Sequence, residues 1–148
     1  MLKIGIASDH RGYNLKKQII EQLKDKYQMI DCGTNSEQSV DYPDYAFKLG
    51  KLITSKNADF GIAICGTGIG ISIACNKVKG IRCAKVDRIE EAEATRKDND
   101  ANIIAFGEKT TLSKALELIE KFINTKASDE EKHVRRRQKI AKYEEQQC

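Results

Sequence analysis

Short apolar runs alternate with helically spaced apolar residues over positions 2–123. Five of the runs have the length and composition of β-strands: LKIGIA (2–7), MIDC (29–32), FGIAIC (60–65), IRCAKV (81–86) and NIIAFG (102–107). The run at 60–65 is the most apolar of the five, which is typical of a central strand buried on both faces.

The segments between these strands have the spacing of amphipathic helices. One stripe consists of Leu15, Ile19, Ile20, Leu23 and Tyr27, and the clearest stripe covers 112–123. Asp44 is predicted to cap a helix that continues to Ile53, and a small-residue helix is predicted over 71–78. Asp87 with Glu90 has the spacing of a capping box.

Alternating strands and helices predict a parallel sheet with helices on both faces. We therefore expect an α/β fold, a three-layer α/β/α sandwich with a five-stranded Rossmann-like sheet, and we take residues 1–148 as a single domain. The chain becomes highly charged from Lys126 onward, with a thin apolar stripe that includes Val134 and Ile140. A helix this polar buries little apolar surface. Residues 126–148 are either a solvated tail or a helical arm that docks on a partner subunit.

Composition limits the class of protein. Apolar residues make up 40% and charged residues 32% of the 148 residues, which excludes a disordered chain. The net charge of 26 − 22 = +4 suits a small anionic ligand and is too small to indicate nucleic-acid binding. Aromatic residues are only 6%, so stacking on bases is not expected. No apolar run approaches the roughly 20 residues of a membrane-spanning helix.

The five cysteines are odd in number, and none lies in a C-x-x-C pair. Met1 leads directly into LKIGIA, which is too short for the core of a signal peptide. We therefore expect reduced thiols and a cytoplasmic location. Zinc-site spacing is absent from the sequence, so no metal is expected.

Three chemically rich turns follow predicted strands: Ser8–Gly12, Cys65–Gly70 and Gly107–Lys109. Ligands bind beyond the carboxyl ends of the strands in an open parallel sheet. The GTGIG turn at 66–70 allows close backbone approach, and free N–H groups there can hold a phosphate or a developing oxyanion. The dinucleotide fingerprint is not matched, because the third glycine comes one position early. A tight strand-to-helix turn is the alternative interpretation.

Cys65 stands immediately before this turn. A thiolate there could abstract a proton while nearby N–H groups hold the resulting oxyanion. The alternative is a buried structural cysteine. Asp9 could fix the tautomer of His10, which could also be a simple polar loop residue. The KHVRRR cluster at 132–137 could bind phosphate, form a solvated helix face or act as a weak RNA-binding patch.

Five segments carry a family resemblance: SDHRGYNLK (8–16), DCGT (31–34), DYPDYA (41–46), ICGTGIGISIACNKVKGIR (64–82) and NDANIIAFGEK (99–109). Together they resemble the type B ribose-5-phosphate isomerases and the related galactose-6-phosphate isomerase subunits. The resemblance covers nearly the whole chain, and the middle segment is highly specific. It implies a cofactor-independent and metal-independent aldose–ketose isomerase of the pentose phosphate pathway. It also implies a homodimer or dimer of dimers with active sites between subunits.

The resemblance further implies roles for single residues. Cys65 would be the base that moves a proton between C1 and C2, and the Gly66–Gly70 backbone with the Thr67 hydroxyl would hold the enediolate. The implied catalytic residues are Cys65, Thr67 and Asp98. The implied substrate-binding residues are Asp9, His10, Tyr42, Gly66, Gly68, Ile69, Gly70, Asn99, Lys109, Lys132, His133 and Arg136. Of these, Lys109, Lys132 and Arg136 would bind the phosphate, and Arg136 would come from the partner subunit.

Three positions depart from the family pattern. Asp98 stands where the type B enzymes usually have a histidine assigned to ring opening, and Lys109 and Lys132 stand in place of arginines. An ionised carboxyl cannot give a proton to a ring oxygen. Asp98 would therefore act as a base on the anomeric hydroxyl, or as an acid if burial keeps it protonated. Alternatively, His10 or His133 takes over, or the sugar ring opens spontaneously.

The expected reaction is the interconversion of ribose 5-phosphate and ribulose 5-phosphate. Two alternatives follow from the departures. One is a hexose 6-phosphate isomerase of the galactose or allose type, and the other is a non-catalytic paralogue that binds a sugar phosphate.

Overall fold

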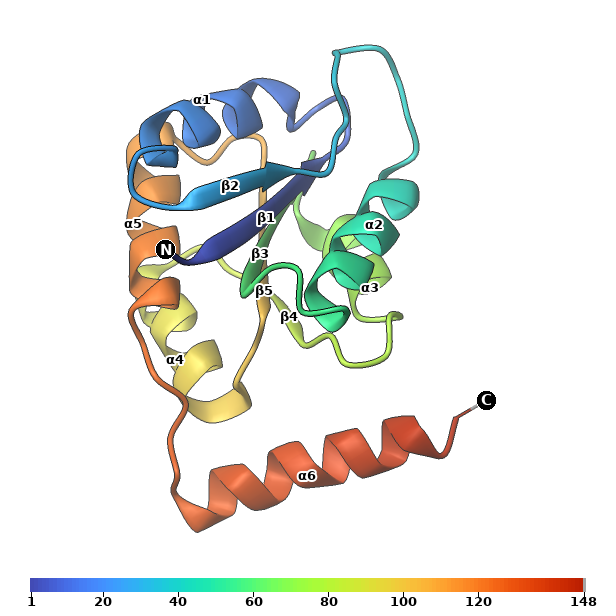
Figure 1. The fold of residues 1–148 in the computed structure, drawn as a ribbon, viewed down its shortest axis with the longest axis vertical. Helices are drawn as coiled ribbons and strands as arrows, with labels where there is room; N and C mark the ends of the chain where they lie inside the picture. Colours follow the sequence, from blue (N-terminus) through green and yellow to red (C-terminus); the bar gives the residue numbers. More distant parts are fainter. Residues whose placement is uncertain (148) are drawn as a thin grey trace.

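A computed structural model describes residues 1–147. Its strands are β1 (Lys3–Ser8), β2 (Gln28–Asp31), β3 (Phe60–Cys65), β4 (Cys83–Lys85) and β5 (Ile103–Gly107). They form one parallel sheet in the order β2–β1–β3–β5–β4, with β3 at the centre (Figure 1). Cys148, the fifth cysteine and the last residue of the predicted arm, lies outside the described residues.

The helices are α1 (Tyr13–Leu23), α2 (Tyr42–Thr54), α3 (Ile69–Cys75), α4 (Ile89–Asn99), α5 (Leu112–Ile123) and α6 (Glu131–Glu145). Figure 1 shows α1, α4 and α5 on one face of the sheet and α2 and α3 on the other. This arrangement confirms the predicted α/β fold with helices on both faces of a five-stranded parallel sheet.

The two faces of the sheet differ in the size of their side chains. Large residues such as Ile4 and Ile62 face α1, α4 and α5, whereas small residues such as Ala63 face α2 and α3. Small side chains let α2 approach closely: a Cβ added to Gly5 would lie 2.8 Å from Leu49 Cδ1. Cys65 belongs to the small-residue face, so its thiol lies on the side of α2 and α3.

Several predicted boundaries were wrong by a few residues. Helix α1 ends at Leu23, so Tyr27 lies in the following turn, where it stays buried with its hydroxyl donating to Glu120 Oε2 at 3.2 Å. Helix α3 begins before the predicted 71–78 span and ends at Cys75. Strand β4 is shorter than the predicted 81–86 run, because as an edge strand it pairs with β5 alone.

The predicted helix starts also shift. Helix α2 begins at Tyr42, with Asp41 as N-cap and Pro43 in the first turn, so Asp44 is not the cap. Proline is favoured there because its fixed φ suits the first turn of a helix. At α4 the capping pair is Arg88 with Glu91, one residue beyond the predicted Asp87 with Glu90.

Residues Glu131–Glu145 form helix α6, which lies apart from the sheet, at the end of α4 (Figure 1). None of its residues, all of which the structure describes, is buried. Polar contacts hold it to its own chain: Gly80 N–H donates to Glu144 Oε1 at 2.7 Å, and Arg137 Nη1 donates to Asp98 O at 3.2 Å. The predicted arm is therefore a helix with a polar attachment to the body of the protein.

Candidate active site

The three predicted turns meet at the carboxyl edge of the sheet. Asp9 N–H donates to Ile64 O at 3.2 Å, and Glu108 N–H donates to Gly66 O at 3.2 Å. These two bonds tie the turns after β1 and β5 to the end of β3. Residues that are far apart in sequence are thus brought to one site, as the strand pattern predicts.

Cys65 lies at the end of the central strand on this edge, and the residue is 4% exposed. Its Sγ accepts a hydrogen bond from Gly68 N–H at 3.2 Å, and Ile69 N–H donates to Thr67 Oγ1 at 3.1 Å. An N–H group that donates to sulfur stabilises a thiolate more than a thiol. The GTGIG turn therefore folds back on the sulfur that precedes it.

Tyr42 covers the far side of the same turn. A Cβ added to Gly70 would lie 2.7 Å from Tyr42 Cζ, so only glycine lets the ring lie this close. The predicted residues Tyr42, Cys65, Gly66, Thr67, Gly68, Ile69 and Gly70 thus form one cluster.

Asp9 and His10 lie beside this cluster, but Asp9 does not bind the imidazole as predicted. Asp9 Oδ1 accepts from Arg11 N–H at 3.0 Å and Gly12 N–H at 3.2 Å, and so holds the turn that leads into α1. His10 Nδ1 instead accepts from Val40 N–H at 3.2 Å. This contact places the proton of a neutral imidazole on Nε2. A loop distant in sequence, and not the neighbouring carboxylate, sets the tautomer.

A cavity of about 650 Å³ opens next to the cluster. Its walls are Arg11, Gly66, Thr67, Asp87, Gly107, Lys109, Thr110, Thr111 and Lys114. Three of these residues are cations and one is a carboxylate, so the cavity favours an anion. Lys109 was expected there, whereas Arg11 and Lys114 were missed. The available signal was their position, one just after β1 and the other in the first turn of α5.

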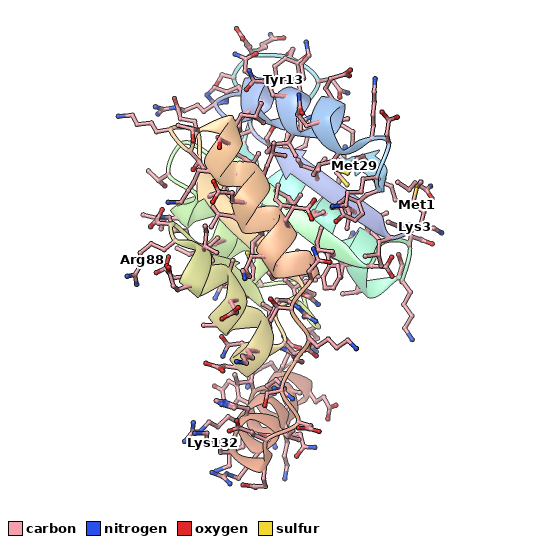
Figure 2. The ribbon with its side chains drawn as sticks, turned by 90° about the vertical axis from the view of Figure 1, so that its left-hand side faces the viewer. Met1, Lys3, Tyr13, Met29, Arg88 and Lys132 are labelled. Atoms are coloured by element: carbon pink, nitrogen blue, oxygen red, sulfur yellow. The ribbon has the colours of Figure 1, made fainter. Side chains whose placement is uncertain are left out.

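The remaining predicted residues lie at the opposite end of the sheet: Asp98, Asn99, Lys132, His133 and Arg136. Asn99 O accepts from Arg82 Nε at 2.7 Å, close to the amino end of β4. Figure 2 shows Lys132 on α6, below the body of the protein. The six residues of β3 separate this end from Cys65, a length of about 16 Å. One chain therefore does not bring the two groups together.

An acid–base pair stands within this second group. His133 Nε2 lies 3.5 Å from Asp98 Oδ1 and 3.8 Å from Glu130 Oε2, and the His133 side chain is only 17% exposed. Asp98, which the resemblance places at the ring-opening position, is thus in contact with an imidazole from the start of α6.

Two cysteines outside the turn at 66–70, Cys32 and Cys83, have raised pKa values. A hydrogen bond with the Cys75 thiol, together with burial, raises the pKa of Cys83. Burial, followed by the charge of Asp31, raises the pKa of Cys32. Cys32, Cys65, Cys75 and Cys83 are all free thiols. Raised pKa values keep Cys32 and Cys83 protonated at neutral pH.

Within residues 1–147, no three His, Cys, Asp or Glu side chains come together as metal ligands would. Over the same residues, every helix is too short or too polar to span a bilayer.

Residues 4–140 match the family described as ribose/galactose isomerase. The chain belongs to this family. Among curated relatives in the family, the chain is 44% identical to a Bacillus subtilis protein with the provisional name sugar phosphate isomerase, over 97% of this chain and 98% of the relative. It is also 42% identical to Escherichia coli ribose-5-phosphate isomerase B, over 74% of each chain.

Solved structures of the ribose/galactose isomerase family have the same fold. Clostridium thermocellum ribose-5-phosphate isomerase B has a TM-score of 0.93 and 45% identity, covering 97% of this chain and 98% of that one. The Mycoplasma genitalium enzyme, solved with bound ribulose 5-phosphate, has a TM-score of 0.90 and 37% identity, covering 99% and 98%. The resemblance predicted from the sequence motifs is confirmed.

Proposed function

We propose that this protein interconverts ribose 5-phosphate and ribulose 5-phosphate without a cofactor. The observation that carries the proposal is the Cys65 sulfur, held by the Gly68 N–H beside a cationic cavity. Relatives named ribose-5-phosphate isomerase B support the substrate, since they match nearly the whole chain.

Cys65 serves as the base in this proposal. Its thiolate removes the proton from C2 of the open-chain aldose, which gives an enediolate, and later delivers that proton to C1. The hydroxyl proton moves from O2 to O1 in the enediolate, so that the carbonyl passes from C1 to C2. Thr67 Oγ and main-chain N–H groups of the GTGIG turn stabilise the enediolate oxygen. No oxidant or reductant takes part, because the hydrogen moves within one carbohydrate.

Ring opening requires a group that can give a proton to the ring oxygen. Asp98 as an ionised carboxylate cannot do so. His133 Nε2 lies 3.5 Å from Asp98 Oδ1, and an imidazole can carry that proton when charged. We assign ring opening to this pair, with Asp98 orienting His133.

The pair reaches Cys65 only if a second subunit supplies it, because β3 separates the two groups within one chain. An exposed apolar face supports a homodimer. Ile69 and Ile73 on α3 are 54% and 57% exposed, and Tyr42 and Phe47 on α2 are also exposed. Ile69 and Ile73 are four residues apart, so they lie on one side of α3. We infer that this face packs against a second copy and brings the partner's α4 end and α6 to the Cys65 cluster.

The expected cytoplasmic location remains a prediction. The free thiols of the four described cysteines support a reducing compartment.

Replacing Cys65 by alanine tests the mechanism. We expect kcat to fall by about 10²–10⁴-fold, the usual contribution of a general base. Cys32→Ala is the matched control, since Cys32 is a free cysteine outside the Cys65 cluster. Ribulose 5-phosphate formation and circular dichroism should be measured on both variants. A folded Cys65→Ala protein with wild-type turnover would overturn the proposal.

A hexose 6-phosphate isomerase is the second candidate, because Asp98 replaces the histidine expected of a type B ribose-5-phosphate isomerase. Parallel assays with ribose 5-phosphate and with galactose and allose 6-phosphates separate the two reactions. Binding of ribose 5-phosphate without turnover of any of these sugars would instead indicate a non-catalytic paralogue.

A further inference from the structure

Arg11 lies directly over the turn that follows Cys65. A Cβ added to Gly66 would lie 3.3 Å from Cδ, Nε and Cζ of Arg11, so the guanidinium covers that glycine. The hydrogen bonds from Arg11 N–H and Gly12 N–H to Asp9 hold the backbone that carries this side chain. Arg11 is thus positioned at the wall of the cationic cavity, next to the turn that holds the sulfur.

Glu108 occupies one edge of the Arg11 guanidinium. Arg11 Nε pairs with Glu108 Oε2, and the Arg11 side chain remains 58% exposed. Within residues 1–147, Arg11 forms no other ion pair. Its Nη1 and Nη2 nitrogens donate no hydrogen bond to a side chain or carbonyl there. A guanidinium can use the edge formed by Nη1 and Nη2 to bind two oxygens of one phosphate. Pairing through Nε leaves this edge available.

The cationic side chains in the wall of this cavity outnumber the one carboxylate there. Lys109 and Lys114 are further cations in the wall, and α5 begins there after Thr111. The carboxylate in the wall, Asp87, is already paired with Lys85 Nζ at 2.6 Å. A volume of about 650 Å³ lies in the range of small-molecule sites.

We propose that Arg11 is a phosphate-binding residue of this isomerase, with its Nη1–Nη2 edge on two phosphate oxygens and its Nε on Glu108. The proposal rests on the proposed function, because it places the phosphate of the same substrate in this cavity. Arg11 supplies a planar two-point contact that Lys109, a point charge, cannot make. Arg11 and Lys109 are far apart in the chain, so the sequence motifs did not reveal that both line the same cavity.

The test compares Arg11→Ala, Arg11→Lys and Arg88→Ala in the full-length protein. Arg88 is the matched control: it projects from the start of α4 in Figure 2, is exposed and does not line the cavity. Dissociation constants for ribose 5-phosphate and for inorganic phosphate should be measured by titration calorimetry, together with kcat and KM. Circular dichroism checks that each variant is folded.

We expect Arg11→Ala to raise the dissociation constants of both probes, and KM, by about 10- to 100-fold, as for loss of charge-assisted hydrogen bonds. The value of kcat should stay within about threefold, because binding of the phosphate contributes equally to substrate and transition state. Arg11→Lys should lose about 3- to 10-fold, since it keeps the charge without the fork. Arg88→Ala should change binding by less than about twofold.

Unchanged affinity of both probes in Arg11→Ala would overturn the proposal. Equal losses in Arg11→Ala and Arg88→Ala would also overturn it, because they would reflect overall charge. A lysine variant with wild-type affinity would refute the two-point contact. The proposed function fails separately: wild-type protein that binds ribose 5-phosphate through Arg11 but forms no ribulose 5-phosphate is a binding protein and not an isomerase.

Discussion

Replacing Gly68 by alanine would place a methyl group against the backbone of β5. Gly68 has φ of 80°, and the added Cβ would lie 2.7 Å from the carbonyl carbon of Phe106 and 2.8 Å from its Cα. Backbone atoms in the interior of a sheet cannot move aside as a flexible side chain does. The substitution therefore combines an unfavourable φ with steric overlap.

Gly80 offers a matched control for the φ effect. It has φ of 90°, but the nearest atom to an added Cβ is Thr54 Cγ2 at 3.2 Å, at the end of a side chain. A left-handed backbone costs alanine about 1–2 kcal/mol at either position. Overlap with the sheet adds about 1–3 kcal/mol at Gly68 alone. We therefore expect Gly68→Ala to lose about 2–5 kcal/mol of the free energy of unfolding, and Gly80→Ala about 1–2 kcal/mol.

The same substitution should reduce activity. Relief of the overlap moves the turn, and with it the Gly68 N–H that donates to Cys65 Sγ at 3.2 Å. Loss of one such preorganised donor typically lowers kcat by about 10²-fold. Urea unfolding and steady-state kinetics on both glycine variants measure the two effects. Equal destabilisation of the two variants, or full kcat in folded Gly68→Ala, would refute this reasoning.

Three further changes test other parts of the protein. Hydrogen bonds from the N–H groups of Asp87 and Arg88 lower the pKa of Glu91 from its ordinary 4.5, so its stabilisation is present above that pH and lost as pH falls through the lowered value. Glutamine keeps an oxygen that can accept these hydrogen bonds, so Glu91→Gln should cost only about 0.3–1 kcal/mol of unfolding free energy at pH 7, and the difference should shrink below pH 4.5 in urea titrations. Ile73→Glu should convert the proposed dimer to monomers in light scattering and abolish isomerisation. His133→Ala should lower kcat/KM for ribose 5-phosphate by about 100-fold, and adding D98H should restore part of it.

A specific result would contradict each of these three predictions. A cost of Glu91→Gln that is the same at pH 7 and pH 3 would mean that the cap is not electrostatic. A dimeric and active Ile73→Glu protein would place the subunit contact elsewhere. Unchanged kinetics in His133→Ala would assign ring opening to another group.

Elements with strong local signals were predicted closely from the sequence. Strand β3 covers 60–65 and α5 covers 112–123, as predicted, because a continuous apolar run and a clear helical stripe each leave one way to bury their apolar side chains. The start of α4 was one residue off, since Arg88 and Glu91 and the predicted pair Asp87 and Glu90 have the same spacing. Spacing alone does not distinguish adjacent registers.

The Cys65–GTGIG segment could be predicted from the sequence because its contacts are local. The Gly68 N–H reaches the Cys65 sulfur three residues away through the geometry of one turn. The hydrogen-bond donor to His10 could not be predicted, because Val40 lies in a loop thirty positions further along the chain. Asp9, the neighbour in sequence, uses its carboxylate to hold the turn.

By itself, the sequence determined the alternation of strands and helices, the thiol at the end of the central strand and the glycines that follow it. Only the tertiary structure decided that Arg11 stands in the cavity with Lys109, and that Asp98 and His133 lie at the other end of the sheet. The physical reason is the range of the interactions. Turns and helices form through neighbours in the chain, whereas the distance between side chains of different turns depends on how the strands pair and where each helix crosses the sheet.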